Sequence, residues 1–283
     1  MNLPEFHSNI MTLHVNEDVP YLTYDTLTRI PFIRHAFSTR LGGVSKGQFS
    51  SMNFSLNRGD NPDDVLENYR RFCHAVGFDF HTLVASSQDH HTFVRKVGSE
   101  NYGVGIFRPK DIQSVDALVT DEPDVTLVTY YADCTPLFFV DTVKKVIALA
   151  HGGWRGTVGR IAENVINVMK NDYGCQAKDI VCCIGPAISR CCYEVDRACF
   201  DEFARMEDID LSEIATAKEN GKYMIDLLET NRQVILSCGV PENNITVSDV
   251  CTKCNSDLLW SHRATNGQRG TMSAFLCIKG NQE

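Results

Sequence analysis

The chain has 283 residues, of which 43% are hydrophobic and 22% are charged, enough to bury a full-sized core in one large domain or two small ones. Its formal net charge of −9 disfavours nucleic acid or an anionic membrane surface as the main partner. No apolar stretch approaches a membrane-spanning length, and residues 1–18 lack the charged-then-apolar pattern of a signal peptide. We therefore expect a soluble, cytoplasmic protein.

Twelve cysteines raise the question of disulfide bonds, but their pattern argues against them. Cys182-Cys183 and Cys191-Cys192 are adjacent pairs, and adjacent cysteines rarely form structural disulfides. Most of the twelve lie in apolar runs, where a free cysteine behaves as a small hydrophobic residue. We expect reduced thiols, as is usual in a cytosolic enzyme of this size.

The first predicted elements are a short strand and a well-capped helix. Residues 34–38 form the strand, which leads into the glycine-containing loop 39–45. Asn61 and Pro62 then mark a helix start, with Asn as the N-cap and Pro at the first helical position. Apolar side chains recur at helical spacing up to Gly77, which ends the helix.

The middle of the chain is rich in β-branched and aromatic residues and predicts buried strands. Residues 125–140 predict two strands around a break at 133–136, because Pro136 disfavours a regular central ladder. A strand at 145–150 enters the glycine-rich loop 151–156, and a helix follows; this order presents backbone N–H groups to an anion. Further strands are expected at 180–184, 245–250 and 272–278, and further helices at 198–206 and 225–238.

The organisation of the chain favours a single domain over residues 1–283. It contains no fixed-period repeat, low-complexity segment or long linker. Strands and helices are both abundant, but they do not alternate strictly. A mixed α/β sandwich is therefore expected rather than a doubly wound parallel sheet.

Three dispersed side chains form a candidate metal-binding set: a histidine of the pair His90-His91, together with Cys134 and His151. Each lies at the edge of an apolar run. Two imidazoles and one thiolate would hold zinc and leave a fourth position open, as in a catalytic site. Gln88 and Asp89 are candidates to orient a ligand imidazole. The alternative for the histidine pair is a hydrogen-bonded surface role, and spacing alone does not establish that the three ligands converge.

Asp133 strengthens the case for Cys134. An aspartate beside a cysteine in an apolar segment is costly to bury unless it is paired or near a metal. The alternative is that Asp133 caps a turn before Pro136.

The loop after His151 is a candidate anion site. Its glycines allow a ligand to approach the backbone, Trp154 offers a stacking face and Arg155 a bidentate clamp. A tight strand-to-helix turn with Trp154 in the core accounts for the same residues equally well. Arg40 is a candidate second guanidinium, although a solvated loop charge is the favoured reading of that residue alone.

Cys251 and Cys254 form a C-x-x-C motif that looks like half a zinc knuckle. No second pair follows it, so a closed site of four cysteines is not expected and structural thiols are favoured. Lys253 is only weak support for a redox dithiol.

Several short motifs occur in a fixed order along the chain, from about residue 30 to the C-terminus. They are Thr39–Ser45, Ser51–Phe54, Asp60–Asn68, Gln88–His91, Ala132–Pro136, Ala150–Gly156, Gly185–Ile188, Cys192–Val195 and Ser261–Arg263. In this order they closely resemble the YfiH/YlmD family, also called the laccase-domain or multicopper polyphenol oxidase family.

The resemblance implies a single-domain four-layer α/β/β/α sandwich and a zinc ion held by His90, Cys134 and His151, with copper as the alternative metal. It selects His90 over His91 as the ligand. Two departures from the family pattern lie here: Asp89 and His91 replace valine and glycine, so His91 is a candidate substrate contact. The C-terminal Thr-Gly-Arg-Met motif reads Arg269-Gly270-Thr271-Met272, and no role is carried over to Arg269.

The resemblance also implies phosphorolysis of purine nucleosides (adenosine, inosine and methylthioadenosine), with adenosine deaminase activity, in a monomer or homodimer. Arg40, Arg155 and the glycine-loop N–H groups suit phosphate, and Asn53 suits ribose or phosphate. Deamination needs a metal-activated water and a general acid/base, for which Asp133 is the candidate. The usual nucleobase-deaminase signature is absent.

Three other functions stay open. A copper-dependent polyphenol oxidase would normally need more clustered histidines. A cysteine hydrolase would use Cys134 as nucleophile and His151 as base. Some relatives are also associated with peptidoglycan editing.

Overall fold

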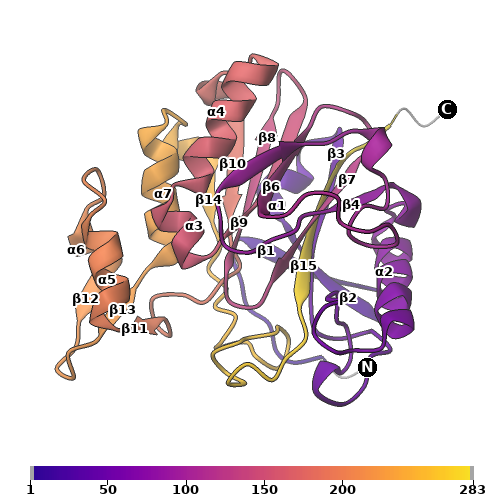
Figure 1. Cartoon of the computed structure of the whole chain (residues 1–283), viewed down its shortest axis with the longest axis horizontal. Helices are drawn as coiled ribbons and strands as arrows, with labels where there is room; N and C mark the ends of the chain where they lie inside the picture. The colour runs from indigo at the N-terminus through magenta and orange to yellow at the C-terminus, as the bar shows by residue number, and fades with distance from the viewer. Residues whose placement is uncertain (1–2, 281–283) are drawn as a thin grey trace.

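The computed structural model describes residues 3–280, so the first two and last three residues of the expected domain lie outside it. Two six-stranded sheets form its centre (Figure 1). The first sheet has the order β1 (Met11–Asn16), β2 (Val19–Tyr24), β3 (Ile33–Ser38), β15 (Met272–Ile278), β7 (Thr126–Tyr131) and β4 (Leu83–Ala85). The second has the order β14 (Ile245–Val247), β10 (Ile180–Ile184), β8 (Thr135–Asp141), β9 (Val146–Gly152), β6 (Val115–Thr120) and β5 (Phe93–Lys96).

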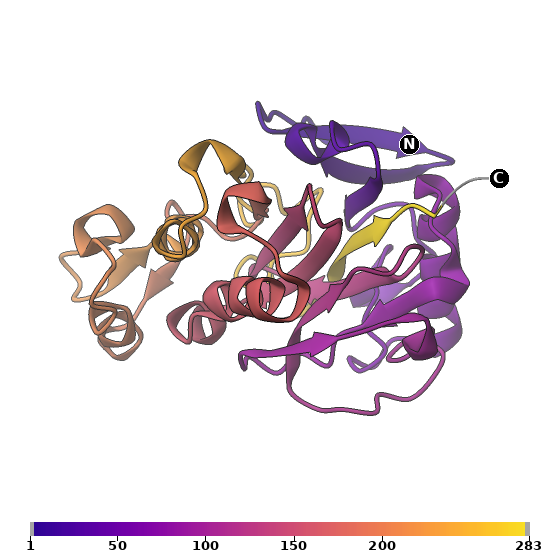
Figure 2. The same ribbon diagram turned by 90° about the horizontal axis from the view of Figure 1, so that it is seen from above.

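Helices cover the outer face of each sheet. The helix α2 (Pro62–Val76) packs on the first sheet, where Phe72 stacks on Phe275 of β15. On the other side, α4 (Ile161–Tyr173) and α7 (Leu227–Ser237) pack on the second sheet. A third apolar cluster fills the space between the two sheets. The expected α/β/β/α sandwich is confirmed (Figure 2).

Smaller elements complete the molecule. A small sheet of β11 (Glu194–Val195), β13 (Tyr223–Ile225) and β12 (Ala215–Ala217), with α5 (Arg197–Ala204) and α6 (Leu211–Ile214), projects from one end (Figure 1). The remaining short helices are α1 (Asp25–Thr28) and α3 (Trp154–Val158) and the 3-10 turns Gly47–Phe49, Phe80–Thr82, Ser99–Asn101, Ala177–Asp179 and Glu242–Asn244. No helix within residues 3–280 is long and apolar enough to cross a membrane.

The two capping residues that predicted the ends of α2, Asn61 and Gly77, form the expected capping contacts. The Asn61 side chain accepts a hydrogen bond from the Asp63 N–H at 3.0 Å. Gly77 ends the helix at φ 89°, and its N–H bonds to the Cys73 carbonyl. A left-handed residue at this position favours glycine because glycine has no Cβ to clash.

The prediction around Pro136 was partly wrong. The expected break at 133–136 is shorter, and Pro136 is the second residue of the central strand β8. Its missing N–H costs no ladder bond, because pairing with β10 begins only at Leu137. On the other side, β9 runs two residues beyond the predicted 145–150 and includes His151, which pairs with Pro136. His151 is therefore held by a sheet rather than by a loop.

His35 is a buried histidine of β3 whose ring is kept neutral. Its Nε2 accepts a hydrogen bond from the Tyr24 N–H at 2.8 Å, and Phe138 packs edge-on against the ring. Burial, with a smaller effect of His14, lowers the pKa of His35 to about 3.

The buried His35 predicts a loss of stability in mild acid. Below pH ~6.5 the unfolded chain protonates this ring while the native state does not, so the free energy of unfolding falls by up to about 1.4 kcal/mol per pH unit. Urea unfolding between pH 7 and 5 measures this slope. His35→Gln, which keeps an acceptor, should flatten it, whereas the exposed His81→Gln should not; an unchanged slope in His35→Gln would contradict the assignment.

Candidate metal and substrate site

The structure brings His90, Cys134 and His151 together. His90 lies in the loop after β4, Cys134 in the turn between β7 and β8, and His151 on β9. One ligand atom from each lies within 4.8 Å of the other two, and the two imidazole centroids are 4.9 Å apart. His91 lies outside this group: its Nδ1 pairs with an Asp89 carboxylate oxygen at 2.6 Å, and its ring is exposed.

A buried carboxylate, Asp116 on β6, holds the site in place. It is fully buried and accepts hydrogen bonds from the N–H groups of Asp89, His90 and His91 at 3.3, 3.1 and 2.9 Å. It also bonds to Nδ1 of His151 at 2.8 Å. With Nδ1–H donating to the carboxylate, Nε2 of His151 is left to bind a metal.

The proton affinities reflect this arrangement. Burial raises the pKa of Asp116, but the hydrogen bond from His151 and the backbone donors outweigh burial and lower it. Burial likewise lowers the pKa of His151, yet the Cys134 sulfur and Asp116 outweigh it and raise the pKa to about 9. Partial desolvation and the nearby His151 lower the pKa of His90. A metal would therefore displace a proton from His151, which couples metal binding to pH.

The sequence alone did not lead us to predict a role for Asp116. The available signal was an acidic residue inside the apolar run 115–120, since a buried charge requires partners. The orienting role that was expected of Gln88 and Asp89 belongs to Asp116 instead. Gln88 bonds to both backbone groups of Tyr130, at 2.8 and 2.6 Å, and Asp89 bonds to His91 and Ser114.

Two residues of the site adopt a left-handed backbone conformation that is uncommon for side chains other than glycine. His90 has φ 71° and Asp133 has φ 84°. Each such residue costs about 1–3 kcal/mol, so its surroundings must enforce it. For His90 the enforcing contacts are the backbone bonds to Asp116. For Asp133 they are hydrogen bonds from the Thr252 hydroxyl at 2.6 Å and the Arg263 N–H at 2.7 Å.

Gly153 leaves the space between the three ligands open. A Cβ at this position would lie 2.7 Å from His90 Nδ1 and 3.3 Å from both Cys134 Sγ and His151 Cε1. Its φ of −66° is ordinary, so glycine is needed here for space. Two imidazoles, one thiolate and an unfilled centre suit a borderline-soft metal ion with an open coordination position.

A cavity of about 280 Å³ opens onto the three ligands. Three cationic side chains line it: Arg58, Lys110 and Arg269. Burial, then the neighbouring Arg58, lowers the pKa of Arg269 to about 10, and its buried Nε has no hydrogen-bond partner. The remaining lining includes Gln88, Tyr130, Tyr131 and Thr271.

The arginines predicted for phosphate do not line this cavity. The Arg40 guanidinium lies 3.8 Å from the Trp260 ring centroid and donates to the Ser256 carbonyl. The Arg155 guanidinium lies 4.2 Å from the Trp154 ring centroid. Arg155 and Trp154 line a second cavity of about 860 Å³, together with Tyr193 and Arg263. The roles of Arg40, Arg155 and Trp154 with phosphate stay predictions.

Asn53 and Asp133 are likewise occupied by the protein itself. Asn53 is fully buried; it donates to Asp60 at 2.8 Å and accepts from the Thr271 N–H at 2.9 Å, so it supports the cavity lining from behind. Both carboxylate oxygens of Asp133 accept protein hydrogen bonds. A general acid/base role for Asp133 stays a prediction, because that carboxylate already anchors a loop.

Replacing Asp116 should weaken metal binding without removing a ligand. In Asp116→Asn, the amide N–H₂ would face backbone donors and the His151 tautomer would lose its orientation, so we expect roughly 10- to 100-fold weaker binding. A competition titration with a chromophoric chelator measures this. Asp89→Asn, in the same loop, is the matched control and should bind nearly as tightly as the natural protein; equal losses in both variants would refute the role of Asp116.

Filling the space at Gly153 should also displace the metal. Gly153→Ala places a methyl group 2.7 Å from His90 Nδ1, so we expect loss of bound metal and of activity in a protein with an unchanged circular dichroism spectrum. The control is Gly156→Ala, whose Cβ would meet nothing closer than 3.1 Å. Full metal content in Gly153→Ala would show that the centre lies elsewhere.

Comparison with known proteins places this chain in a family. Residues 34–279 match the family model described as multi-copper polyphenol oxidoreductase laccase. The purine nucleoside phosphorylase YlmD of Geobacillus stearothermophilus is 37% identical over 84% of this chain and 88% of its own length. A purine nucleoside phosphorylase of Bacteroides thetaiotaomicron is 31% identical over 94% of this chain and 99% of its own.

Solved structures agree with the sequence matches. The crystal structure of the Bacillus licheniformis hypothetical protein YfiH superposes with a TM-score of 0.89 at 30% identity, covering 94% of this chain and 99% of that one. Sequence and fold together show that the chain belongs to the YfiH/YlmD family of laccase-like multicopper polyphenol oxidoreductase proteins.

Proposed function

We propose that this chain is a zinc-dependent purine nucleoside phosphorylase that acts on adenosine and inosine, with methylthioadenosine as a further candidate substrate. The observation that carries the proposal is the cavity in which the ligands His90, Cys134 and His151 face cationic side chains. Relatives aligned over most of the chain bear the name purine nucleoside phosphorylase.

Zinc is the metal proposed because the donor set suits it. A thiolate and two imidazoles match its preference, and Asp116 supplies the hydrogen bond that such a histidine ligand needs. When bound, zinc would act as a Lewis acid that polarises a substrate oxygen or nitrogen or activates water.

Phosphorolysis requires a phosphate oxygen to form a bond to the ribose anomeric carbon while the glycosidic C–N bond breaks. The departing base takes the bonding electron pair and needs a proton. We assign phosphate to Arg58, Lys110 and Arg269, because three cations around one small cavity would bind a dianion and orient it. Arg269 lines the cavity and donates to the protein through Nη1, to the Gly270 carbonyl and the Thr271 hydroxyl.

Adenosine deamination is proposed as a second reaction of the same site. Water would add at the purine C6 and ammonia would leave, without phosphate. Asp133 is the candidate general acid/base, because it directly precedes Cys134 in the turn between β7 and β8.

Two alternatives have a specific observation each. The family description names laccase, but among residues 3–280 no candidate metal group contains more than two histidines, whereas multicopper oxidation needs more. A cysteine hydrolase gains a Cys134–His151–Asp116 arrangement, because Asp116 orients the presumed base. Ready alkylation of Cys134 in a native protein that lacks metal would favour the hydrolase.

Activity assays with and without phosphate test the proposal. Purified protein should release free base and ribose 1-phosphate from inosine only when phosphate is present, and ammonia from adenosine in either condition. Chromatography and an ammonia assay measure the products. Release of base that does not depend on phosphate would contradict phosphorolysis, and oxidation of phenols at a comparable rate would favour the laccase reading.

Arg269 gives a sharper test of where phosphate binds. Loss of a charge-assisted hydrogen bond costs about 1.5–3 kcal/mol, so Arg269→Gln should raise KM for phosphate by about 10- to 100-fold. Arg71→Gln, an exposed arginine of α2 paired with Glu67, is the control. Steady-state kinetics at varied phosphate decides; an effect confined to the KM for nucleoside would move phosphate out of this cavity.

A further inference from the structure

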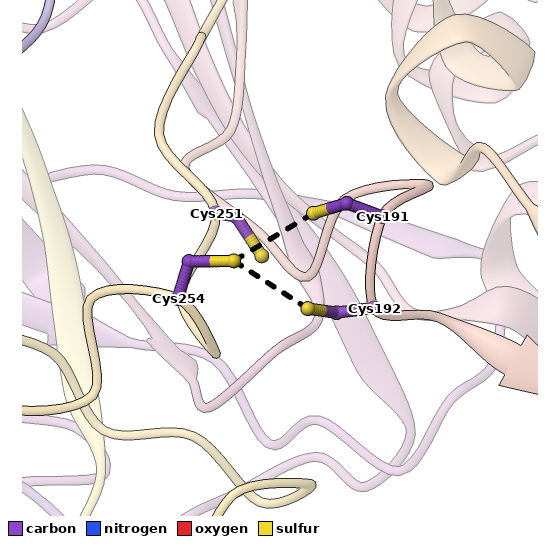
Figure 3. Close-up of side chains that lie close together, drawn as sticks. All are labelled: Cys191, Cys192, Cys251 and Cys254. Carbon is purple, nitrogen blue, oxygen red and sulfur yellow. Dashed lines mark hydrogen bonds between the residues drawn. The ribbon is translucent and has the colours of Figure 1, made fainter.

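Four cysteine side chains converge at a place that the proposed function does not use. Cys191 and Cys192 lie in the loop between β10 and β11, and Cys251 and Cys254 lie in the loop after β14. Their sulfur atoms all lie within 4.8 Å of one another and point toward a common centre (Figure 3). No cysteine pair follows the C-x-x-C motif in the sequence, whereas Cys191 and Cys192 precede Cys254 by 63 and 62 positions.

The sulfur spacing matches a tetrahedral metal site and not a disulfide. The Cys254 sulfur lies 3.7 Å from that of Cys191 and 3.5 Å from that of Cys192. A disulfide would need about 2.05 Å, and all twelve cysteines are free, as expected from the sequence. Four thiolates bound to one zinc at about 2.3 Å would lie about 3.8 Å apart.

Hydrophobic packing accounts for Cys251, which lies in the core, and for Cys192, which packs on it, but not for Cys191 and Cys254. Cys191 and Cys254 are exposed and Cys192 is half-buried, while only Cys251 is buried. Exposed thiols gain little from the hydrophobic core. The Ser189 N–H points at the Cys251 sulfur at 3.5 Å, a contact of the kind that supports a thiolate ligand.

We propose that Cys191, Cys192, Cys251 and Cys254 together bind one zinc ion in a closed structural site. Four protein ligands leave no open position, so the ion would have no catalytic role. The site shares no ligand with His90, Cys134 and His151, and the proposal is independent of the proposed function.

The ion would cross-link two loops, the one between β10 and β11 and the long segment that precedes β15. Residues 248–271 contain no helix or strand, and segments of this kind longer than ~12–15 residues are uncommon in compact domains. This segment meets the β10–β11 loop at the bridge between Ala187 and Cys251, where the Thr252 N–H donates to the Ala187 carbonyl at 2.9 Å.

Both loops converge on Asp133, which precedes the ligand Cys134. The Ile188 N–H donates to the Asp133 carbonyl at 2.9 Å, and Thr252 and Arg263 donate to its carboxylate. Arg269 of the cavity lies on the same long loop. The proposed zinc would thus hold in place one wall of the other site.

Metal analysis of the whole chain, purified under reducing conditions with zinc, tests the proposal. The natural protein should hold two zinc ions per chain, and Cys254→Ser should hold one. Cys238→Ser, a half-buried cysteine outside the cluster, is the matched control and should keep two. The double variant His90→Ala, Cys134→Ala should keep the cluster ion.

X-ray absorption at the zinc edge keeps the test decisive if Cys254→Ser does not fold. Averaged over one site with four sulfurs and one with a single sulfur, the natural protein should show about 2.5 sulfur ligands per zinc. The proposal is overturned by a single zinc that the double variant loses, by an average of one sulfur per zinc, or by iron in place of zinc. A Cys191–Cys254 or Cys192–Cys254 disulfide in unreduced native protein would also overturn it.

Discussion

One fully buried carboxylate organises the site. Asp116 is at zero exposure in β6, the strand next to the edge strand β5 of the second sheet, and a charge there is tolerated only if its partners replace the lost water. Three consecutive backbone N–H groups of residues 89–91 and the His151 ring provide them. The hydrogen bonds that this carboxylate accepts therefore hold the loop at His90 in a left-handed backbone conformation. They also orient the ring of His151 on another strand.

The other side of the site depends on a similar arrangement around Asp133. Its left-handed backbone turns Cys134 toward the two histidines, and its carboxylate is held by the long loop that precedes β15. That loop also carries Arg269 into the cavity. Strained residues persist where several contacts enforce them, and in the proposed zinc cluster the four cysteines would add a further constraint. Ligand geometry and the cationic wall would then respond together to any change in this loop.

The distribution of the arginines bears on how family motifs should be used. Arg40 and Arg155 stand in recognisable glycine-rich segments, yet one stacks on Trp260 and the other faces a different cavity. The cavity itself is lined by Arg58, Lys110 and Arg269, none of which was selected from the sequence. A motif records that residues occur together along the chain, whereas an anion-binding site depends on which side chains meet in space and remain unpaired.

Local signals in the sequence determined much of this protein. The cap at Asn61, the glycine at Gly77 and the strand at 272–278 act through neighbouring residues, and all three appear as expected. The ordered motifs also predicted the sandwich and selected His90, Cys134 and His151, which the structure brings together. Tertiary structure alone decided that Asp116 orients His151, that Arg269 reaches the cavity, and that Cys191 and Cys192 meet Cys251 and Cys254. His151 and Asp116 are 35 positions apart, and Cys191 and Cys254 are 63 positions apart. The energy of such contacts comes from pairing buried or crowded groups across sheets and loops. No local periodicity in the sequence encodes that pairing.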